Sequence, residues 1–275
     1  MKFGVSTFIT DEGIGPRALG PALEERGFDT LLLAEHSHIP VSRETPYPGG
    51  GELPRVYYRT LDPFVALAAA ASVTRDLLLG TGIALVVQRD PITTAKEIAS
   101  LDLVSGGRAV FGVGAGWNRE EMRNHGTDPA SRGRLMDERI RAMIELWTKD
   151  EAEFHGDFVD FAPVYAWPKP VQRPHPPIWV GGNSERTFAR VAEYGSAWLP
   201  SALPPKELGA RIEQMRKTAG DRPAVVVYAG GSDRESLDTY AELGVDRVLL
   251  YLPTQPEDET LRTLDELAEA VSAHR

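Results

Sequence analysis

The sequence predicts an α/β fold, a single TIM-type (β/α)8 barrel domain over residues 1–275. The first indication is size, because 275 residues, 42% of them hydrophobic, suit one large core and are too few for two α/β domains of ordinary size. The second is an alternation of short apolar runs with amphipathic stretches, typical of parallel strands joined by right-handed crossovers. The third is that eight such runs occur, the number that closes this kind of barrel.

Each apolar run is short and is bounded by polar or turn-forming residues, so each predicts one buried strand. In chain order, the expected strands are residues 3–8, 30–34, 77–86, 109–114, 178–181, 197–200, 225–229 and 248–252. The stretches between them carry apolar residues at helical spacing. They predict helices that include residues 63–73, 93–104, 136–147, 185–194, 206–218, 235–243 and 258–273.

Two segments interrupt this alternation, and both are expected to be insertions. Residues 37–59, after the second strand, are rich in proline, glycine and tyrosine. Residues 150–177, before the fifth strand, begin with a pattern that predicts a hairpin and end in a proline-rich connection. Long excursions from a compact domain usually carry function, so the first insertion is a candidate part of a binding site.

Composition excludes several function classes. The net charge of −10, without a long run of like charges, argues against binding to nucleic acid or to an anionic membrane surface. The absence of cysteine excludes disulfides, cysteine-ligated zinc, iron–sulfur clusters and thiol nucleophiles. The N-terminal segment lacks the features of a signal peptide and no segment is apolar enough to span a bilayer, so a cytoplasmic location is expected.

In a β/α barrel the loops after the strands converge on one face, so candidate site residues are sought there. Glu35 and His36 follow the second strand, and the imidazole could hold or move a proton beside a bound cofactor. An equally good interpretation is that His36 only ends the strand's loop. No metal site is expected, because His36 and His38 have no third ligand at a recognisable spacing.

Glycines mark two further loops. Gly80 and Gly82 interrupt the third strand, which indicates either a close backbone approach to a ligand or a bend required for barrel closure. The run from Gly114 through Gly116 ends the fourth strand, but Trp117 occupies the third glycine position of a dinucleotide fingerprint. This loop therefore indicates backbone contact with a flat or anionic group, or else a tight turn, more than it indicates a dinucleotide.

The loop after the fifth strand gives the strongest signal. Gly181 and Gly182 lead into a helix whose cap is Asn183 or Ser184. Free N–H groups and the helix dipole at such a position bind anions, and phosphate suits it well. A capping box explains Ser184 but does not explain the paired glycines.

The segments from Gly114 to Glu121 and from Lys169 to Ser184 resemble the luciferase-like monooxygenase superfamily, and within it a subgroup of probable F420-dependent oxidoreductases of actinobacterial type. The agreement extends from Met1 to about Ser201. The resemblance implies a cofactor ring in the barrel mouth, supported by a non-proline cis peptide between Gly82 and Ile83. It also implies that the loop after the fifth strand holds the phosphate.

The resemblance implies a set of site residues. The expected catalytic residues are His36 and Glu35, since F420-using relatives often carry an acidic residue followed by histidine there. The expected cofactor-binding residues are Gly82, Ile83, Gly114, Ala115, Gly116, Asn118, Gly181, Gly182, Asn183 and Ser184, and the expected substrate pocket is lined by Phe8, Trp117 and Trp198. Sugar-phosphate dehydrogenases of the superfamily have a carboxylate in place of Trp117, so their substrate is not expected here.

The expected function is hydride transfer between coenzyme F420 and a small organic substrate. Arg43, Arg55 and Arg59 of the first insertion could meet the acidic tail of F420. The alternatives are a monooxygenase that uses reduced FMN and O2, and a flavin-binding protein without catalysis. A cofactor reductase and a second copy of the chain are further candidate partners.

Overall fold

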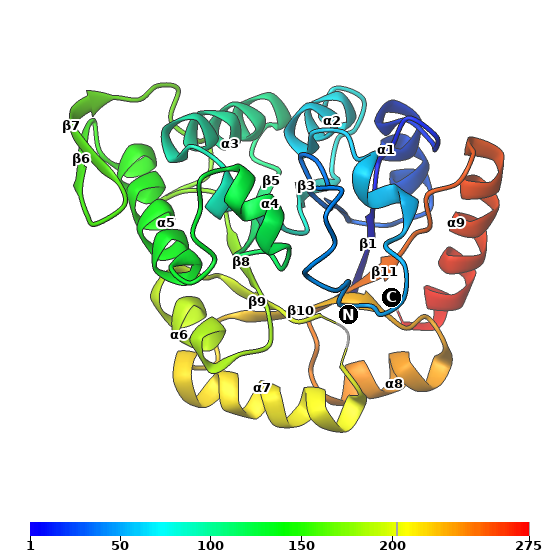
Figure 1. Ribbon diagram of the computed structural model, residues 1–275. Helices are drawn as coiled ribbons and strands as arrows, with labels where there is room; N and C mark the ends of the chain where they lie inside the picture. The colour runs from blue at the N-terminus through cyan, green and yellow to red at the C-terminus, as the bar shows by residue number, and fades with distance from the viewer. Residues whose placement is uncertain (202, 275) are drawn as a thin grey trace.

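The computed structural model describes residues 1–201 and 203–274. Parallel strands form a closed barrel with helices around it (Figure 1). The sheet order is β3-β2-β1-β11-β10-β9-β8-β5-β4, and a further pairing of β3 with β5 closes the ring. The expected eight-stranded TIM-type barrel is therefore confirmed.

The strands are all short. Their bounds are β1 Lys2–Thr7, β2 Thr30–Leu33, β3 Leu78–Thr81, β4 Ala84–Leu85, β5 Ala109–Gly114, β8 Ile178–Gly181, β9 Ala197–Leu199, β10 Ala224–Gly230 and β11 Arg247–Tyr251. The helices are α1 Pro16–Glu25, α2 Pro63–Ala71, α3 Pro91–Ser105, α4 Arg119–Asn124, α5 Arg132–Thr148, α6 Glu185–Tyr194, α7 Pro205–Ala219, α8 Arg234–Glu242 and α9 Glu257–Val271. Single 3-10 turns cover Arg55–Tyr58, Val86–Gln88 and Ser272–His274.

The core has two parts because successive strand residues face opposite sides of the sheet. Outward-facing side chains such as Val5, Leu31 and Phe111 pack against the helices in one large cluster. Inward-facing side chains fill the barrel in a second cluster formed by Leu32, Val110, Trp179, Ala197, Leu199, Val226 and Leu249. The barrel interior is therefore packed, and open space is left only near its ends.

The third barrel strand differs from expectation in one respect. The sequence predicts one strand over residues 77–86, whereas the structure divides it into β3 and β4. The two residues between them, Gly82 and Ile83, are joined by a non-proline cis peptide bond, so that prediction is confirmed. A side chain at Gly82 would meet Leu32 and Tyr228, which explains why only glycine fits this break.

Helix ends are set by local capping that periodicity alone does not locate. The helix expected over residues 93–104 begins at Pro91, because the carboxylate of Asp90 accepts a hydrogen bond from the Thr93 N–H and proline is tolerated in the first turn. It ends at Gly106, which adopts a left-handed conformation. Apolar spacing finds the buried face of a helix and leaves its first turn undefined.

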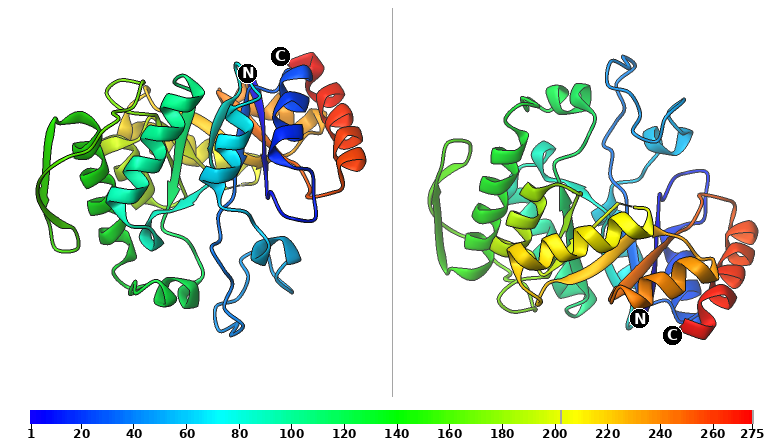
Figure 2. Two further views of the ribbon diagram at one scale, coloured as in Figure 1. Left: turned by 90° about the horizontal axis from the view of Figure 1, so that it is seen from above. Right: turned by 90° about the horizontal axis from the view of Figure 1, so that it is seen from below.

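Both expected insertions are present. The first forms a long loop between β2 and α2, and this loop and α4 project from the same end of the barrel (Figure 2). The second contains the antiparallel hairpin of β6 (Glu151–His155) and β7 (Asp160–Tyr165), which lies at the periphery beside α5 (Figures 1 and 2). None of the helices formed by the described residues is long and apolar enough to cross a membrane.

A candidate cofactor cavity at the carboxyl ends of the strands

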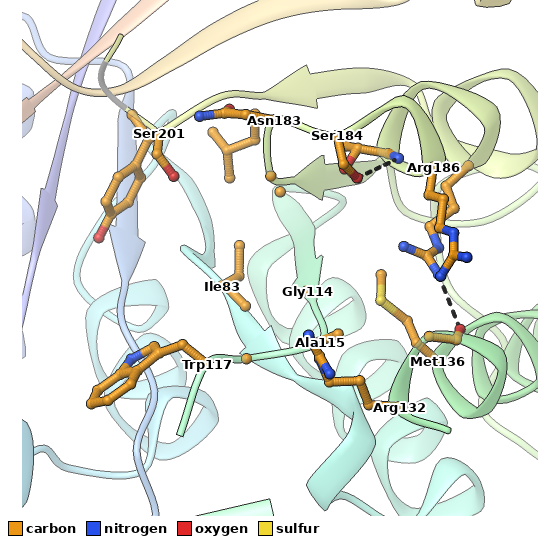
Figure 3. A pocket seen from close by; sticks show the side chains of 18 of the residues that line it. Ile83, Gly114, Ala115, Trp117, Arg132, Met136, Asn183, Ser184, Arg186 and Ser201 are labelled. Atoms are coloured by element: carbon orange, nitrogen blue, oxygen red, sulfur yellow. Dashed lines mark hydrogen bonds between the residues drawn. The ribbon is translucent and has the colours of Figure 1, made fainter. Parts of the chain in front are cut away.

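A cavity of about 720 Å³ opens where the loops after several barrel strands converge. Ile83 lies near its centre, with Trp117 on one side and Arg132 and Arg186 on the other (Figure 3). The cavity is lined by Pro48, Gly82, Ile83, Gly114, Ala115, Gly116, Trp117, Ala130, Arg132, Gly133, Met136, Gly181, Gly182, Asn183, Ser184, Arg186, Thr187, Arg190, Leu199, Ser201 and Tyr228. It thus has an apolar aromatic end and a cationic end.

Bare backbone forms much of the cavity wall around Ile83. A Cβ atom at Gly114 would overlap the Cδ1 atom of Ile83, and one at Gly181 would lie 3.0 Å from its Cγ2 atom. The two glycines therefore let the isoleucine side chain lie against two neighbouring strands. The result is a smooth apolar surface that suits one face of a flat ligand.

The first turn of α6 supplies an anion-binding geometry. Ser184 is the N-cap, and its hydroxyl oxygen accepts a hydrogen bond from the Thr187 N–H at 3.3 Å. Gly182 has a φ of 116°, a conformation that side chains rarely adopt. The buried Oδ1 atom of Asn183 has no hydrogen-bond partner among the described residues, as expected of a group that meets a ligand.

Trp198 supports this loop from behind. It is fully buried, packs edge-on against Phe188 of α6, and donates its indole N–H to the Gly182 carbonyl oxygen at 2.7 Å. This corrects the expectation that Trp198 lines the substrate pocket. The alternation of strand residues places it on the outer face of the barrel, whereas its neighbour Leu199 faces the cavity.

Three arginines gather at the other end of the cavity. Arg190 forms an ion pair with Asp137 at 2.6 Å and is thereby neutralised. Arg132 donates to the carbonyl oxygen of Pro129 at 2.6 Å, and neither it nor Arg186 has an acidic partner among the described residues. Two uncompensated guanidinium groups next to a helix N-terminus bind an anionic group well.

Sequence reasoning missed these arginines. Arg186 lies two residues after the predicted cap, and its position in the first turn of the helix was an available signal. Arg132 comes from the start of α5, four residues before the helix was expected to begin, and no local pattern connects it with the glycine loop. Arg132 and Arg186 line the same cavity only because the barrel brings α5 beside α6.

An aromatic cluster adjoins the opposite end of the cavity. Phe8 and Trp117, both expected in the substrate pocket, contact Tyr57 from the first insertion, with ring centroids 4.8 and 6.3 Å from it. Tyr47 lies 5.3 Å from Tyr57 and 6.1 Å from Trp117. Burial, more than the nearby Tyr47, raises the pKa of Tyr57 well above its ordinary value, so its hydroxyl stays neutral. The compartment formed by Phe8, His36, Tyr47, Tyr57 and Trp117 is called the aromatic compartment below.

The structure separates the two expected catalytic residues. His36 belongs to the aromatic compartment, with its ring 5.1 Å from Tyr57 and 6.0 Å from Trp117. Glu35 instead accepts hydrogen bonds from the Arg89 side chain at 2.5 Å and from the Leu85 N–H at 2.6 Å. One oxygen holds the N–H of Leu85 in β4 and the other holds Arg89 beyond it, which gives Glu35 a structural role; a catalytic role for Glu35 stays a prediction.

Asn118 and two expected arginines lie away from the cavity lining. Asn118 is the buried N-cap of α4, where its Oδ1 accepts from the Glu121 N–H at 3.4 Å while its Nδ2 has no partner among the described residues, so a cofactor contact by Asn118 stays a prediction. Arg55 and Arg59 do not reach the cavity, since they pair with Glu12 and Asp11. Of the three arginines expected to meet an acidic tail, Arg43 alone lies near the site, 5.7 Å above the Trp117 ring.

Tyr228 is a cavity residue that the sequence did not single out. It comes from β10 and approaches Gly82, whose added Cβ would lie 2.9 Å from the tyrosine ring. Burial raises the pKa of Tyr228 to about 12, so a neutral hydroxyl stands at this position near pH 7. A tyrosine inside a strand of apolar residues looks like core, which is why pattern alone did not find it.

Sequence comparison finds related proteins along the whole chain. A family model described as luciferase-like monooxygenase matches residues 16–229. The uncharacterized protein Rv0953c of Mycobacterium tuberculosis is 40% identical over 276 residues, covering 98% of both chains. The FMNH(2)-dependent dimethylsulfone monooxygenase of Pseudomonas putida is 33% identical over 163 residues, which cover 56% of this chain and 45% of that protein.

Solved structures share the fold at lower identity. The monooxygenase RslO1 from Streptomyces bottropensis has a TM-score of 0.81 and 22% identity, covering 100% of this chain and 99% of that one. The coenzyme F420-dependent tetrahydromethanopterin reductase from Methanopyrus kandleri has a TM-score of 0.73 and 16% identity, covering 99% of each chain. One barrel therefore occurs with both monooxygenase and F420-dependent activities.

Proposed function

The chain belongs to the luciferase-like monooxygenase family of oxidoreductases, and from this premise we propose that it transfers a hydride between coenzyme F420 and a small organic substrate. The observation that carries the proposal is the arrangement of the cavity. A smooth floor at Ile83 lies between an aromatic end and a cationic end. A cofactor with a flat redox ring and an anionic tail would fit this arrangement, with the ring on the floor at Ile83 and the tail at the cationic end.

The residues present fit such a cofactor. The ring would lie on Gly82 and Ile83, where the wall is bare backbone and an apolar side chain. The phosphate would meet the first turn of α6, beside the N-cap Ser184, and the guanidinium of Arg186. The unpartnered Asn183 Oδ1 is an acceptor and would instead suit a hydroxyl or N–H of the cofactor. When bound, the cofactor supplies two-electron chemistry that no side chain of this protein can supply.

The protein's own residues would bind the substrate and manage its protons. The aromatic compartment would contact an apolar substrate bound beside Trp117. The imidazole of His36 lies in the same compartment and would hold or deliver a proton to the substrate. Tyr228 would contribute the edge of its ring to the cavity wall beside Gly82.

The charge of the cationic end supports F420 over FMN. FMN ends at a single phosphate, whereas the tail of F420 carries further acidic groups beyond it. Arg132 and Arg186 have no acidic partners among the described residues, and with the positive N-terminal end of α6 they offer somewhat more positive charge than the roughly two negative charges of one phosphate. This favours the more acidic tail.

Parallel titration of the purified protein with F420 and with FMN, in oxidised and reduced forms, tests this proposal. We expect F420 to bind more tightly, with an affinity that weakens as ionic strength rises. Cofactor-loaded protein is then offered a panel of alcohols and carbonyl compounds, and the redox state of F420 is followed by its absorbance. Micromolar FMN binding without detectable F420 binding would reverse the choice of cofactor.

The second candidate function is that of an FMN-dependent monooxygenase using reduced flavin and O2. The similarity to the P. putida enzyme over 163 residues favours it, and the aromatic compartment would lie beside a flavin bound in the cavity. Such an enzyme needs a supply of reduced flavin, so a flavin reductase would be its partner. Binding of either cofactor with no turnover on any tested substrate would instead support a flavin-binding protein without catalysis.

A further inference from the structure

His36 and Glu121 form a buried pair that links the loop after β2 to the first turn of α4. The imidazole Nδ1 lies 2.8 Å from the carboxylate Oε2. The carboxylate is fully enclosed, and the histidine side chain is almost so. Burying a carboxylate is costly unless it is paired, and the imidazole is its hydrogen-bonding side-chain partner.

The pair is incomplete on both sides. The Oε1 atom of Glu121 is buried and has no hydrogen-bond partner among the described residues. The Nε2 atom of His36 also has no protein partner in the described part of the chain. Unlike Glu121 Oε1, it is not fully enclosed by protein. A pair that served only to hold two loops together would be expected to satisfy these atoms.

The chemistry of the two groups fixes the proton. An ionised carboxylate can only accept a hydrogen bond, so the imidazole nitrogen that faces it must carry hydrogen. In the neutral ring the proton therefore stays on Nδ1, and Nε2 keeps its lone pair. The ring lies in the aromatic compartment beside Tyr57 and Trp117, and Trp117 lines the cavity where the substrate is expected.

Glu121 is itself held in place. It is the third residue of α4, its N–H is capped by Asn118, and the first turn of a helix favours a negative charge. The same segment begins with Gly116 and Trp117, which line the cavity. One short stretch of chain thus shapes the cavity wall and fixes the histidine beside it.

We propose that Glu121 is a positioning residue that holds His36 in the Nδ1–H tautomer, with Nε2 free to exchange a proton with the substrate. Glu121 touches neither substrate nor cofactor and acts through the imidazole. The meaning of the tautomer for catalysis rests on the proposed function. The tautomer itself is a property of the protein alone and can be measured without any cofactor.

The test is NMR of protein with ¹⁵N-labelled histidine, with the His36 signals assigned by their loss in His36→Gln. At a pH where the ring is neutral, we expect the Nδ1–H form of His36 to exceed the Nε2–H form about tenfold or more, as for a hydrogen bond to a charged acceptor. In Glu121→Met, which removes the acceptor at similar volume, the ratio should fall by about tenfold or more. Glu121→Asp should restore part of the preference.

Glu120→Gln is the matched control. Glu120 is the neighbouring buried carboxylate, but it accepts from the N–H and hydroxyl of Thr45 instead of from histidine. The Glu120→Gln variant should therefore leave the ratio of His36 tautomers unchanged. A wild-type His36 dominated by Nε2–H, or a ratio equal in wild type and in Glu121→Met, would overturn the proposal.

Glu121→Gln provides a second variant if the methionine variant does not fold. Its amide can accept from Nδ1–H or donate to a bare nitrogen, so a mixture of tautomers is expected, and retention of the full wild-type ratio would contradict the proposal. Failure of F420 and FMN to bind the wild type would defeat the proposed function and leave the tautomer result standing. The two proposals are thus tested separately.

Discussion

The indole N–H of Trp198 donates a hydrogen bond to the carbonyl oxygen of Gly182, at 2.7 Å, across the wall of the candidate cofactor site. Trp198 lies outside the barrel, packed against Phe188, whereas Gly182 lines the cavity. The bond fixes the anion-binding loop from the side away from the ligand. The loop's inner face is left open for a phosphate.

Replacing Trp198 by phenylalanine should therefore weaken both stability and cofactor binding. The Gly182 carbonyl loses its buried partner, which costs about 1–3 kcal/mol in free energy of unfolding. The loop is also released from its position, so the Kd for F420 should rise. Urea denaturation and cofactor titration measure the two effects.

The matched control is Trp147→Phe. The Trp147 indole also donates to a backbone carbonyl, that of Ala95 at 2.9 Å, and is equally buried, but Ala95, unlike Gly182, does not line the cavity. A similar loss of stability without a change in F420 affinity is expected. Equal effects of the two variants on affinity would show that Trp198 has no specific part in the loop.

Neutralising Arg186 or Arg132 should weaken binding of an anionic cofactor tail. A hydrogen bond to a charged group contributes about 1.5–3 kcal/mol, so each glutamine variant should raise the Kd for F420 about tenfold or more. The salt dependence of binding should also decrease, because fewer charges are involved. Isothermal titration calorimetry at two ionic strengths measures both quantities.

Arg134→Gln is the control for charge alone. Arg134 lies on the same helix as Arg132, is mostly exposed, and points to Asp157 and Phe158 instead of the cavity. It should leave the affinity within about twofold of wild type, as expected for an exposed pair of small energetic weight. A loss equal to that of Arg132→Gln would indicate a general charge effect and contradict the assigned site.

The sequence predicted the barrel because its signal is local and repeated. Strand and helix periodicity depends only on neighbouring residues, and the glycine loops at Gly114 and Gly182 are visible as breaks in that pattern. The same local reasoning failed for Trp198, since a strand pattern does not say which of two alternating faces turns inward. It also placed Glu35 in the site, although the distant Arg89 draws its carboxylate away.

The missed residues share a different cause. Arg132, Tyr57 and Tyr228 come from three elements far apart in the chain, and each looks ordinary in its own segment. Glu121 is the last residue of the motif that begins at Gly114. Only the fold brings it next to His36, which lies 85 residues earlier in the sequence. Pairings of this kind depend on how the loops at the barrel mouth meet, and the sequence pattern does not encode that locally.

Gly114→Ala should damage the floor of the cavity. The added methyl group would overlap Ile83, so the isoleucine must move into the space expected for the cofactor ring. Overpacking of this kind costs about 1–3 kcal/mol in free energy of unfolding. We expect cofactor affinity to fall by more than the stability loss alone explains, as measured by titration of the folded protein.

The comparison variant is Gly15→Ala. Gly15 precedes α1 in an extended conformation, and a Cβ atom there would meet no atom within 4 Å. Its stability and F420 affinity should stay close to wild type. An unchanged affinity in Gly114→Ala would mean that the ring does not rest on Ile83.

Glu35→Gln should reveal a structural role. Glu35 is buried, and it pairs with Arg89 and accepts from the Leu85 N–H; in the variant Arg89 keeps Asp62 and Glu97 but loses its most buried partner. Loss of a charge-assisted hydrogen bond costs about 1.5–3 kcal/mol in free energy of unfolding. Glu97→Gln, which removes a more exposed partner of the same arginine, should cost less. Wild-type stability combined with lost turnover would restore Glu35 as a catalytic candidate.

His36→Ala should separate a proton-transfer role from a structural one. A positioned acid–base group contributes about 10²–10⁴-fold to rate, so kcat should fall by that factor while the Kd for F420 changes little. The assay follows F420 absorbance with the most active alcohol or carbonyl compound of the panel. His38→Ala is the control, because His38 is only half-buried, lies two residues away, and contacts Ser37 and Asn124 instead of the aromatic compartment. If His36 only closes the loop after β2, its removal should lower the melting temperature and leave activity per folded molecule nearly unchanged, and that result would remove it from the mechanism.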